Sequence, residues 1–178
     1  MPWWGWVLAA GALGAVVMFN TMIRRKNAVL FAFAAIDAML KKRYDLIPNL
    51  VEVCKAHMGY ERTVLAEIAS LRAQALGAAG DDAIEVNGRL SQRLRTAMAL
   101  AESYPALKAS DSFDMLSRSL NEVEGQIAAA RRTYNAAVTA YNNGCEMFPV
   151  SLVASAMGYG PRRLFEAEDA ERVPVKAF

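Results

Sequence analysis

The sequence predicts an all-α protein in which an N-terminal transmembrane helix precedes an antiparallel four-helix bundle. Three observations lead to this prediction. Residues 3–23 carry no charge, apolar residues beyond them recur at steps of three or four, and the segments with this period are joined by loops of a few residues. We therefore divide the chain into a transmembrane anchor (residues 1–23), a cytoplasmic bundle (residues 24–157) and an irregular C-terminal tail (residues 158–178).

The uncharged segment has the length of a membrane span. As a helix it would be about 30 Å long, which is the hydrocarbon thickness of a bilayer. A cleaved signal peptide is the alternative, but the run is long for one and no basic side chain precedes it. Aromatic rings at one end and basic side chains at the other are typical of membrane interfaces. The predicted membrane-interface residues are Trp3, Trp4, Trp6, Arg24, Arg25 and Lys26.

The distribution of charge predicts the orientation. All 20 Lys and Arg residues follow the anchor, and two basic clusters, Arg24–Lys26 and Lys41–Arg43, lie within about 20 residues of its end. The positive-inside rule then places the N-terminus outside and the bundle in the cytoplasm, as a single-pass protein of the bacterial inner membrane. In that compartment Cys54 and Cys145 are expected to be free thiols.

The charge balance argues against a nucleic-acid-binding domain. With 20 basic and 18 acidic residues, the net charge is only +2, whereas nucleic acid requires a one-sided basic surface. We expect the two basic clusters to lie near anionic lipid headgroups instead.

The first two bundle helices are predicted to meet at a basic cluster. The first runs from the anchor to about Arg43. Asp45 is expected to cap the second, which places Pro48 in its first turn, where a missing N–H costs nothing. The second helix then continues to about Leu76.

The remaining elements follow from turn residues and period. A loop over residues 77–82 precedes a third helix that stops at Tyr104–Pro105. The fourth helix has the most regular apolar stripe, from Phe113 to Tyr141. Phe148–Pro149 ends it, and a short helical piece is expected around residues 152–157.

The stretch IDAMLKKRYDLIPNLVE, residues 36–52, resembles the core motif of the LemA family of bacterial membrane-associated helical proteins. The resemblance extends along most of the chain, through Phe19–Asn20, Ala101–Pro105, Ala130–Arg132, Tyr134–Asn135, Tyr141–Asn142, Phe148–Pro149 and Gly158–Tyr159. It implies a membrane-anchored four-helix bundle, and no agreed biochemical activity comes with it. It also implies that the matching residues are structural: Asp37, Arg43, Asp45, Pro48 and Asn49.

Residues that could support catalysis are few. His57, the only histidine, forms an i, i+4 pair with Glu61 that could hold a metal, but no second histidine or HExxH motif exists. Cys54 lies three residues from His57, yet an orienting group for such a pair is missing. Asn135, Asn142 and Asn143 are expected either to fix helix register through buried hydrogen bonds or to form a partner-binding face. We therefore predict no catalytic, cofactor-binding or metal-binding residues, and no cofactor.

These observations favour a non-enzymatic, membrane-anchored scaffold or adaptor. Its expected partners are the lipid bilayer and other membrane proteins, and the resemblance implies a membrane protease among them. Gly and Ala at small-xxx-small spacing in the anchor leave self-association as a homo-oligomer open. The alternative is an enzyme or metal-binding helical bundle with a site in its core, which would need inward-facing acidic or histidine residues.

Overall fold

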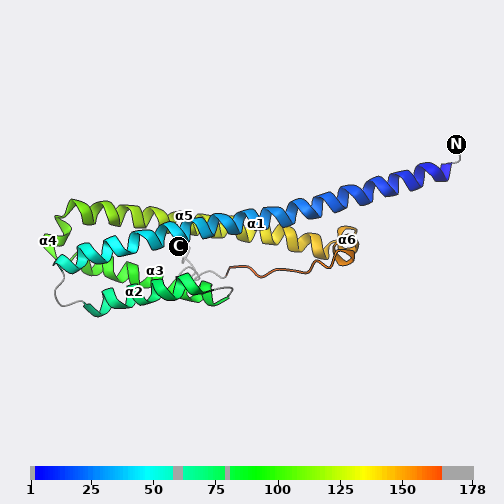
Figure 1. The fold of residues 1–178 in the computed structure, drawn as a ribbon. Coiled ribbons are helices and arrows are strands. Elements are labelled where there is room, and N and C mark those ends of the chain that lie inside the picture. Colours follow the sequence, from blue (N-terminus) through cyan, green and yellow to red (C-terminus); the bar gives the residue numbers. More distant parts are fainter. Residues whose placement is uncertain (1–2, 58–61, 79–80, 166–178) are drawn as a thin grey trace, which may run out of the picture. The chain divides into compact units, whose positions relative to one another are not determined.

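The computed structural model describes residues 3–57, 62–78 and 81–165, and within them the protein is entirely helical (Figure 1). Helix accounts for 88 % of these residues, which contain no strand. The helices are α1 (Trp3–His57), α2 (Arg62–Gly77), α3 (Asp81–Ala101), α4 (Pro105–Lys108), α5 (Asp111–Glu146) and α6 (Val150–Ala156). The described residues form two compact units, of which the first contains residues 3–36 and 129–165 and the second contains residues 37–57, 62–78 and 81–128.

Helix α1 is continuous where the sequence predicted a break. It runs through Asp45, so the prediction that Asp45 caps a second helix is wrong, and Pro48 lies in the helix interior. Pro48 has no N–H to donate to the carbonyl oxygen of Tyr44, four residues earlier. Arg72 on α2 donates its Nε–H to that oxygen instead, at 2.7 Å. The unpaired backbone acceptor is thereby satisfied, and the helix continues past the proline.

The next boundary was also misplaced. The predicted second helix to Leu76 is instead the end of α1, up to His57, followed by α2 from Arg62. Later elements agree better. Helix α3 ends before Pro105, and this proline begins α4 at a position where proline is favoured. Helix α5 covers the predicted fourth helix. Helix α6 begins two residues earlier than expected.

The core of the second unit draws side chains from α1 to α5. Along α2 the buried residues lie three or four apart, which gives one apolar face, and the same holds for the buried apolar residues of α3. The core side chains are Tyr44, Ile47, Leu50, Val51, Cys54, Leu65, Ile68, Leu71, Ala75, Leu90, Leu94, Ala97, Ala101, Leu107, Phe113 and Leu120.

In the first unit, the early part of α1 packs antiparallel to the late part of α5 (Figure 1). The rings of Phe33 and Tyr134 lie 6.1 Å apart, while Met22 approaches Gly144. The core of this unit consists of Met22, Val29, Val138, Tyr141 and Ala154.

A glycine turns the chain back after α6. Gly158 has a φ of 67°, a left-handed conformation that glycine adopts without strain. The amides of Gly158 and Tyr159 donate to the carbonyl oxygens of Ser155 and Ala154, at 3.1 and 2.9 Å. This is a Schellman C-cap, and it directs the following residues back along α5.

Candidate functional site

The N-terminal part of α1 exposes its apolar side chains. An 18-residue window of this helix is apolar enough to span a membrane, and only 6 % of it is buried within the protein. The three predicted interface tryptophans, Trp3, Trp4 and Trp6, are all exposed. A core helix of a soluble protein would bury most of such a surface, so the exposure is typical of a membrane helix.

The basic cluster that follows this segment contacts α5 and the tail. Arg25 donates from Nη1 to the carbonyl oxygen of Ala140, at 3.0 Å. A methyl group on Gly144 would lie 2.7 Å from the same nitrogen, so the glycine makes room for the arginine. Lys26 donates to the Tyr159 hydroxyl, at 3.3 Å, and lies 5.0 Å from the centre of that ring. Arg24 is exposed.

The second basic cluster divides between surface and core. Lys41 and Lys42 are exposed, but Arg43 is fully buried, so the expectation that Arg43 lies near lipid headgroups is wrong. It lies three residues after Leu40 and four before Ile47, on the apolar stripe of α1. That position in the period was a signal for burial that its basic neighbours obscured.

The buried guanidinium of Arg43 joins three helices. From Nη1 it donates to Ser91 Oγ on α3, at 2.7 Å, and to Glu124 Oε1 on α5, at 2.9 Å. Its Nη2 donates to Asn87 Oδ1 on α3. The hydroxyl of Tyr44 donates to the same Asn87 oxygen, at 2.6 Å. A buried charge requires such pairing, because its removal from water costs several kcal/mol.

The partners of Arg43 are themselves held in place. Asn87 donates from Nδ2 to the carbonyl oxygen of Ala83, at 2.7 Å, which fixes its Oδ1 toward the arginine. Ser91 donates to the second carboxylate oxygen of Glu124, at 3.0 Å. Apart from the Nε of Arg43, which has no hydrogen-bond partner among the described residues, these polar groups bind one another, and the arrangement suits positioning of α1 against α3 and α5 rather than chemistry on a substrate.

The other four residues that the resemblance marks as structural do not join this network. Asp37, Asp45, Pro48 and Asn49 all lie on the exposed surface of α1. Of the five, only Arg43 is buried.

Two asparagines of α5 clamp the tail. Asn142 donates from Nδ2 to the carbonyl oxygen of Arg162 and accepts from the amide of the same residue, both at 2.8 Å. Asn135 forms the same pair with the backbone of Phe165, at 3.0 and 2.8 Å. We call these two-bond pairs the asparagine clamps. The sequence predicted hydrogen bonding by these residues, but the bonds hold the tail rather than setting helix register.

The spacing of the asparagine clamps follows from backbone geometry. Seven residues of α-helix rise about 10.5 Å. Arg162 and Phe165 are three residues apart in the irregular tail, and three residues of extended chain span at most about 10 Å, close to the rise along α5. Asn135 and Asn142 therefore match Phe165 and Arg162. Each clamp is preceded on α5 by a tyrosine that contacts the same tail residue, since Tyr134 stacks edge-on against Phe165 and Arg162 lies over Tyr141.

The two thiols are free and separate. Cys54 is buried, and burial raises the pKa of its thiol from 9.0 to about 11, so it is protonated at neutral pH. Cys145 is partly exposed and lies near Tyr141. The pKa of the Tyr141 hydroxyl is raised, mainly because the tyrosine is buried and to a smaller extent because Cys145 is close to it. His57 is the last residue of α1, and its predicted partner Glu61 lies outside the described residues. Over the described ranges, no three His, Cys, Asp or Glu side chains gather as metal ligands would.

Comparison with known protein families matches residues 32–178 to the LemA family. The chain belongs to this family. Among curated proteins it is similar to magnetosome protein MamQ of Magnetospirillum gryphiswaldense, with 22 % identity over 95 % of this chain and 75 % of that protein. It is 21 % identical to MamQ 1 of Paramagnetospirillum magneticum, over 90 % of this chain and 69 % of that protein. Protein LemA of Metamycoplasma hominis is 26 % identical, over 88 % of this chain and 72 % of that protein.

Membership of the LemA family and the exposed apolar helix agree with each other. Together they support a membrane-associated helical protein. The names of the relatives do not describe enzymes.

Proposed function

We propose that this LemA family member is a non-enzymatic, membrane-anchored scaffold. The observation that carries the proposal is the contrast between the two parts of α1. Its first part exposes apolar side chains to the surroundings, and its later part contributes to an apolar core in which Arg43 is hydrogen-bonded to neighbouring helices. Such a chain is suited to hold a helical body at a membrane.

The finer architecture is part of this proposal. Residues 1–23 form the membrane span, and the N-terminus lies outside the bacterial inner membrane, because basic residues follow the span. The body in the cytoplasm is an antiparallel four-helix bundle. Its helices are the later part of α1, α2, α3 and the early part of α5, and the shared core of these four segments supports that assignment.

The body recruits other membrane proteins, and the anchor supports self-association. Gly5, Gly11 and Gly14 leave open space where a side chain would lie, which lets a second helix approach closely. The magnetosome names of two relatives favour a role in organising a membrane compartment, since both proteins align with most of this chain.

Membrane fractionation tests the anchor. The protein should remain in the membrane pellet after an alkaline wash and require detergent for extraction. A mature chain that begins after residue 23 would contradict a retained anchor.

Crosslinking in native membranes tests the scaffold role. We expect covalent capture of membrane proteins, or of a second copy, through cysteines placed on exposed positions of α2. Purified protein that contains a stoichiometric metal ion, or that turns over a substrate, would instead support an enzyme.

A further inference from the structure

The first unit carries a second exposed apolar surface at the turn between α5 and α6. Met147, Phe148 and Leu152 are 62, 80 and 64 % exposed. Residues 147–161 carry no charge, and Glu146 and Arg162 enclose them. Three large exposed apolar side chains on this uncharged turn and the adjoining α6 are costly in water, and their exposure indicates a surface that something covers.

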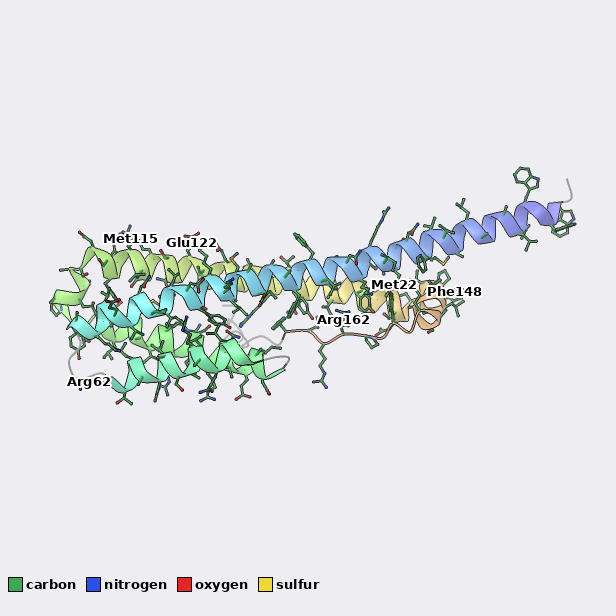
Figure 2. The ribbon with its side chains drawn as sticks, in the orientation of Figure 1. Met22, Arg62, Met115, Glu122, Phe148 and Arg162 are labelled. Atoms are coloured by element: carbon green, nitrogen blue, oxygen red, sulfur yellow. The ribbon has the colours of Figure 1, made fainter. Side chains whose placement is uncertain are left out.

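The contacts between α1 and α5 show where this turn lies along the axis of α1. Ala140 lies beside Arg25, and Gly144 lies beside Met22, one residue before the end of the uncharged segment. Phe148 follows Gly144 by four residues, of which the first two continue α5 toward the N-terminal end of α1. Figure 2 shows Arg162, Met22 and Phe148 in this order toward that end. The turn therefore lies at the level of the uncharged segment of α1.

Basic side chains lie just behind the apolar turn. Arg25 is bonded to Ala140, and Arg162 is clamped to Asn142, only two residues along α5. Lys26 reaches the tail at Tyr159. Apolar side chains ahead of basic ones match the headgroup region of an anionic membrane, where an apolar face enters by about 5–10 Å and cations contact phosphates.

We propose that the turn between α5 and α6, with the adjoining start of α6, is a second membrane contact. It inserts Phe148, Met147 and Leu152 into the cytoplasmic leaflet, where α1 emerges from the membrane. The occupant of this surface is the lipid bilayer, because the turn continues the exposed apolar surface of the anchor at the same level. The inference rests on the proposed membrane anchor. It makes the first unit a two-point attachment.

Spin labels on the full-length protein test this contact. Cys54→Ala and Cys145→Ala remove the native thiols, and single variants Phe148→Cys, Leu152→Cys, Val17→Cys and Met115→Cys carry a nitroxide. The protein is reconstituted into vesicles of phosphatidylethanolamine and phosphatidylglycerol. Collision with oxygen reports lipid, and collision with a water-soluble nickel chelate reports water. Met115 is a matched control, since this apolar residue of the second unit is 68 % exposed (Figure 2).

The labels on Phe148 and Leu152 should show an oxygen-to-nickel collision ratio several-fold above that of Met115 and closer to that of Val17. If Val17 lies in lipid while Phe148 and Leu152 resemble Met115, the anchor stands and the second contact is refuted. If Val17 is also in water, the proposed anchor itself fails. Circular dichroism of each variant checks that the helical fold is retained, and the exposed positions of Phe148 and Leu152 make a folding defect unexpected.

Discussion

Arg72 on α2 supplies the hydrogen bond that Pro48 cannot form within α1. The proline leaves the carbonyl oxygen of Tyr44 without its helical donor, and the Nε of Arg72 lies 2.7 Å from that oxygen. A residue that would end an isolated helix is thus retained because a neighbouring helix satisfies the backbone group it frees.

This relationship predicts coupling between the two residues. Arg72→Met should lower the free energy of unfolding by about 1.5–3 kcal/mol, because a charged donor to a half-buried acceptor is lost. In a Pro48→Ala background the residue-48 amide can donate to Tyr44, so the same change should cost clearly less. Urea denaturation of the wild type, the two single variants and the double variant measures this coupling as a double-mutant cycle. Equal costs in both backgrounds would contradict it.

The buried network of Arg43 predicts a large effect from one substitution. Arg43→Met should destabilise the protein by about 3–5 kcal/mol, since Glu124, Asn87 and Ser91 lose their shared cation. The exposed pair of Arg93 and Glu67, also 2.9 Å apart, is the matched control. Arg93→Met should cost less than about 1 kcal/mol. Thermal or urea unfolding that gives similar costs for the two variants would disprove the assigned role of Arg43.

The asparagine clamps predict local protection of the tail. Asn142→Asp keeps an acceptor for the Arg162 amide but loses the donor to its carbonyl oxygen, so backbone exchange around residue 162 should become faster by about fivefold, as expected for loss of about 1 kcal/mol. Asn135→Asp should do the same around Phe165. Hydrogen exchange with mass spectrometry measures both. The exposed Asn143 is the control, because Asn143→Asp should leave exchange in the tail unchanged.

Burial of Cys54 predicts a loss of stability at high pH. The thiol has a pKa of about 11 when folded, whereas the unfolded chain ionises near 9.0. Between these values the unfolded state loses its proton and the folded state retains it, so the free energy of unfolding should fall as pH rises from 9 to 11. Urea denaturation across this range should show a smaller fall in Cys54→Ala. An identical pH dependence in both proteins would contradict this assignment.

The regular parts of the fold were predictable from periodicity. The stripe from Phe113 to Tyr141 identified α5 because each step of three or four returns a side chain to one face, and the same reasoning located α3. Pro48 misled the prediction because its local preference is for a first turn. The bond from Arg72 that overrides this preference comes from 24 positions further along the chain and leaves no local pattern.

The contacts of the candidate site were less accessible to sequence reasoning. The uncharged segment of α1 and the basic cluster after it could be identified from composition alone. The partners of Arg25 and Lys26 lie more than a hundred residues away on α5 and in the tail, and neither spacing nor charge indicated them. Tyr134–Asn135 and Tyr141–Asn142 form a repeat of seven that is visible in the sequence. Its role in binding the backbone of the tail could be recognised only from the structure.

Seven residues of α5 and three residues of the tail separate the two asparagine clamps. Both clamps can form only if these two numbers of residues are kept. One residue inserted between Arg162 and Phe165 shifts one backbone partner by about 3 Å of extended chain, beyond hydrogen-bonding reach. One residue inserted between Asn135 and Asn142 rotates one amide by about 100° around α5. Relatives that retain the asparagine clamps should therefore preserve the number of residues between the two clamped positions of the tail.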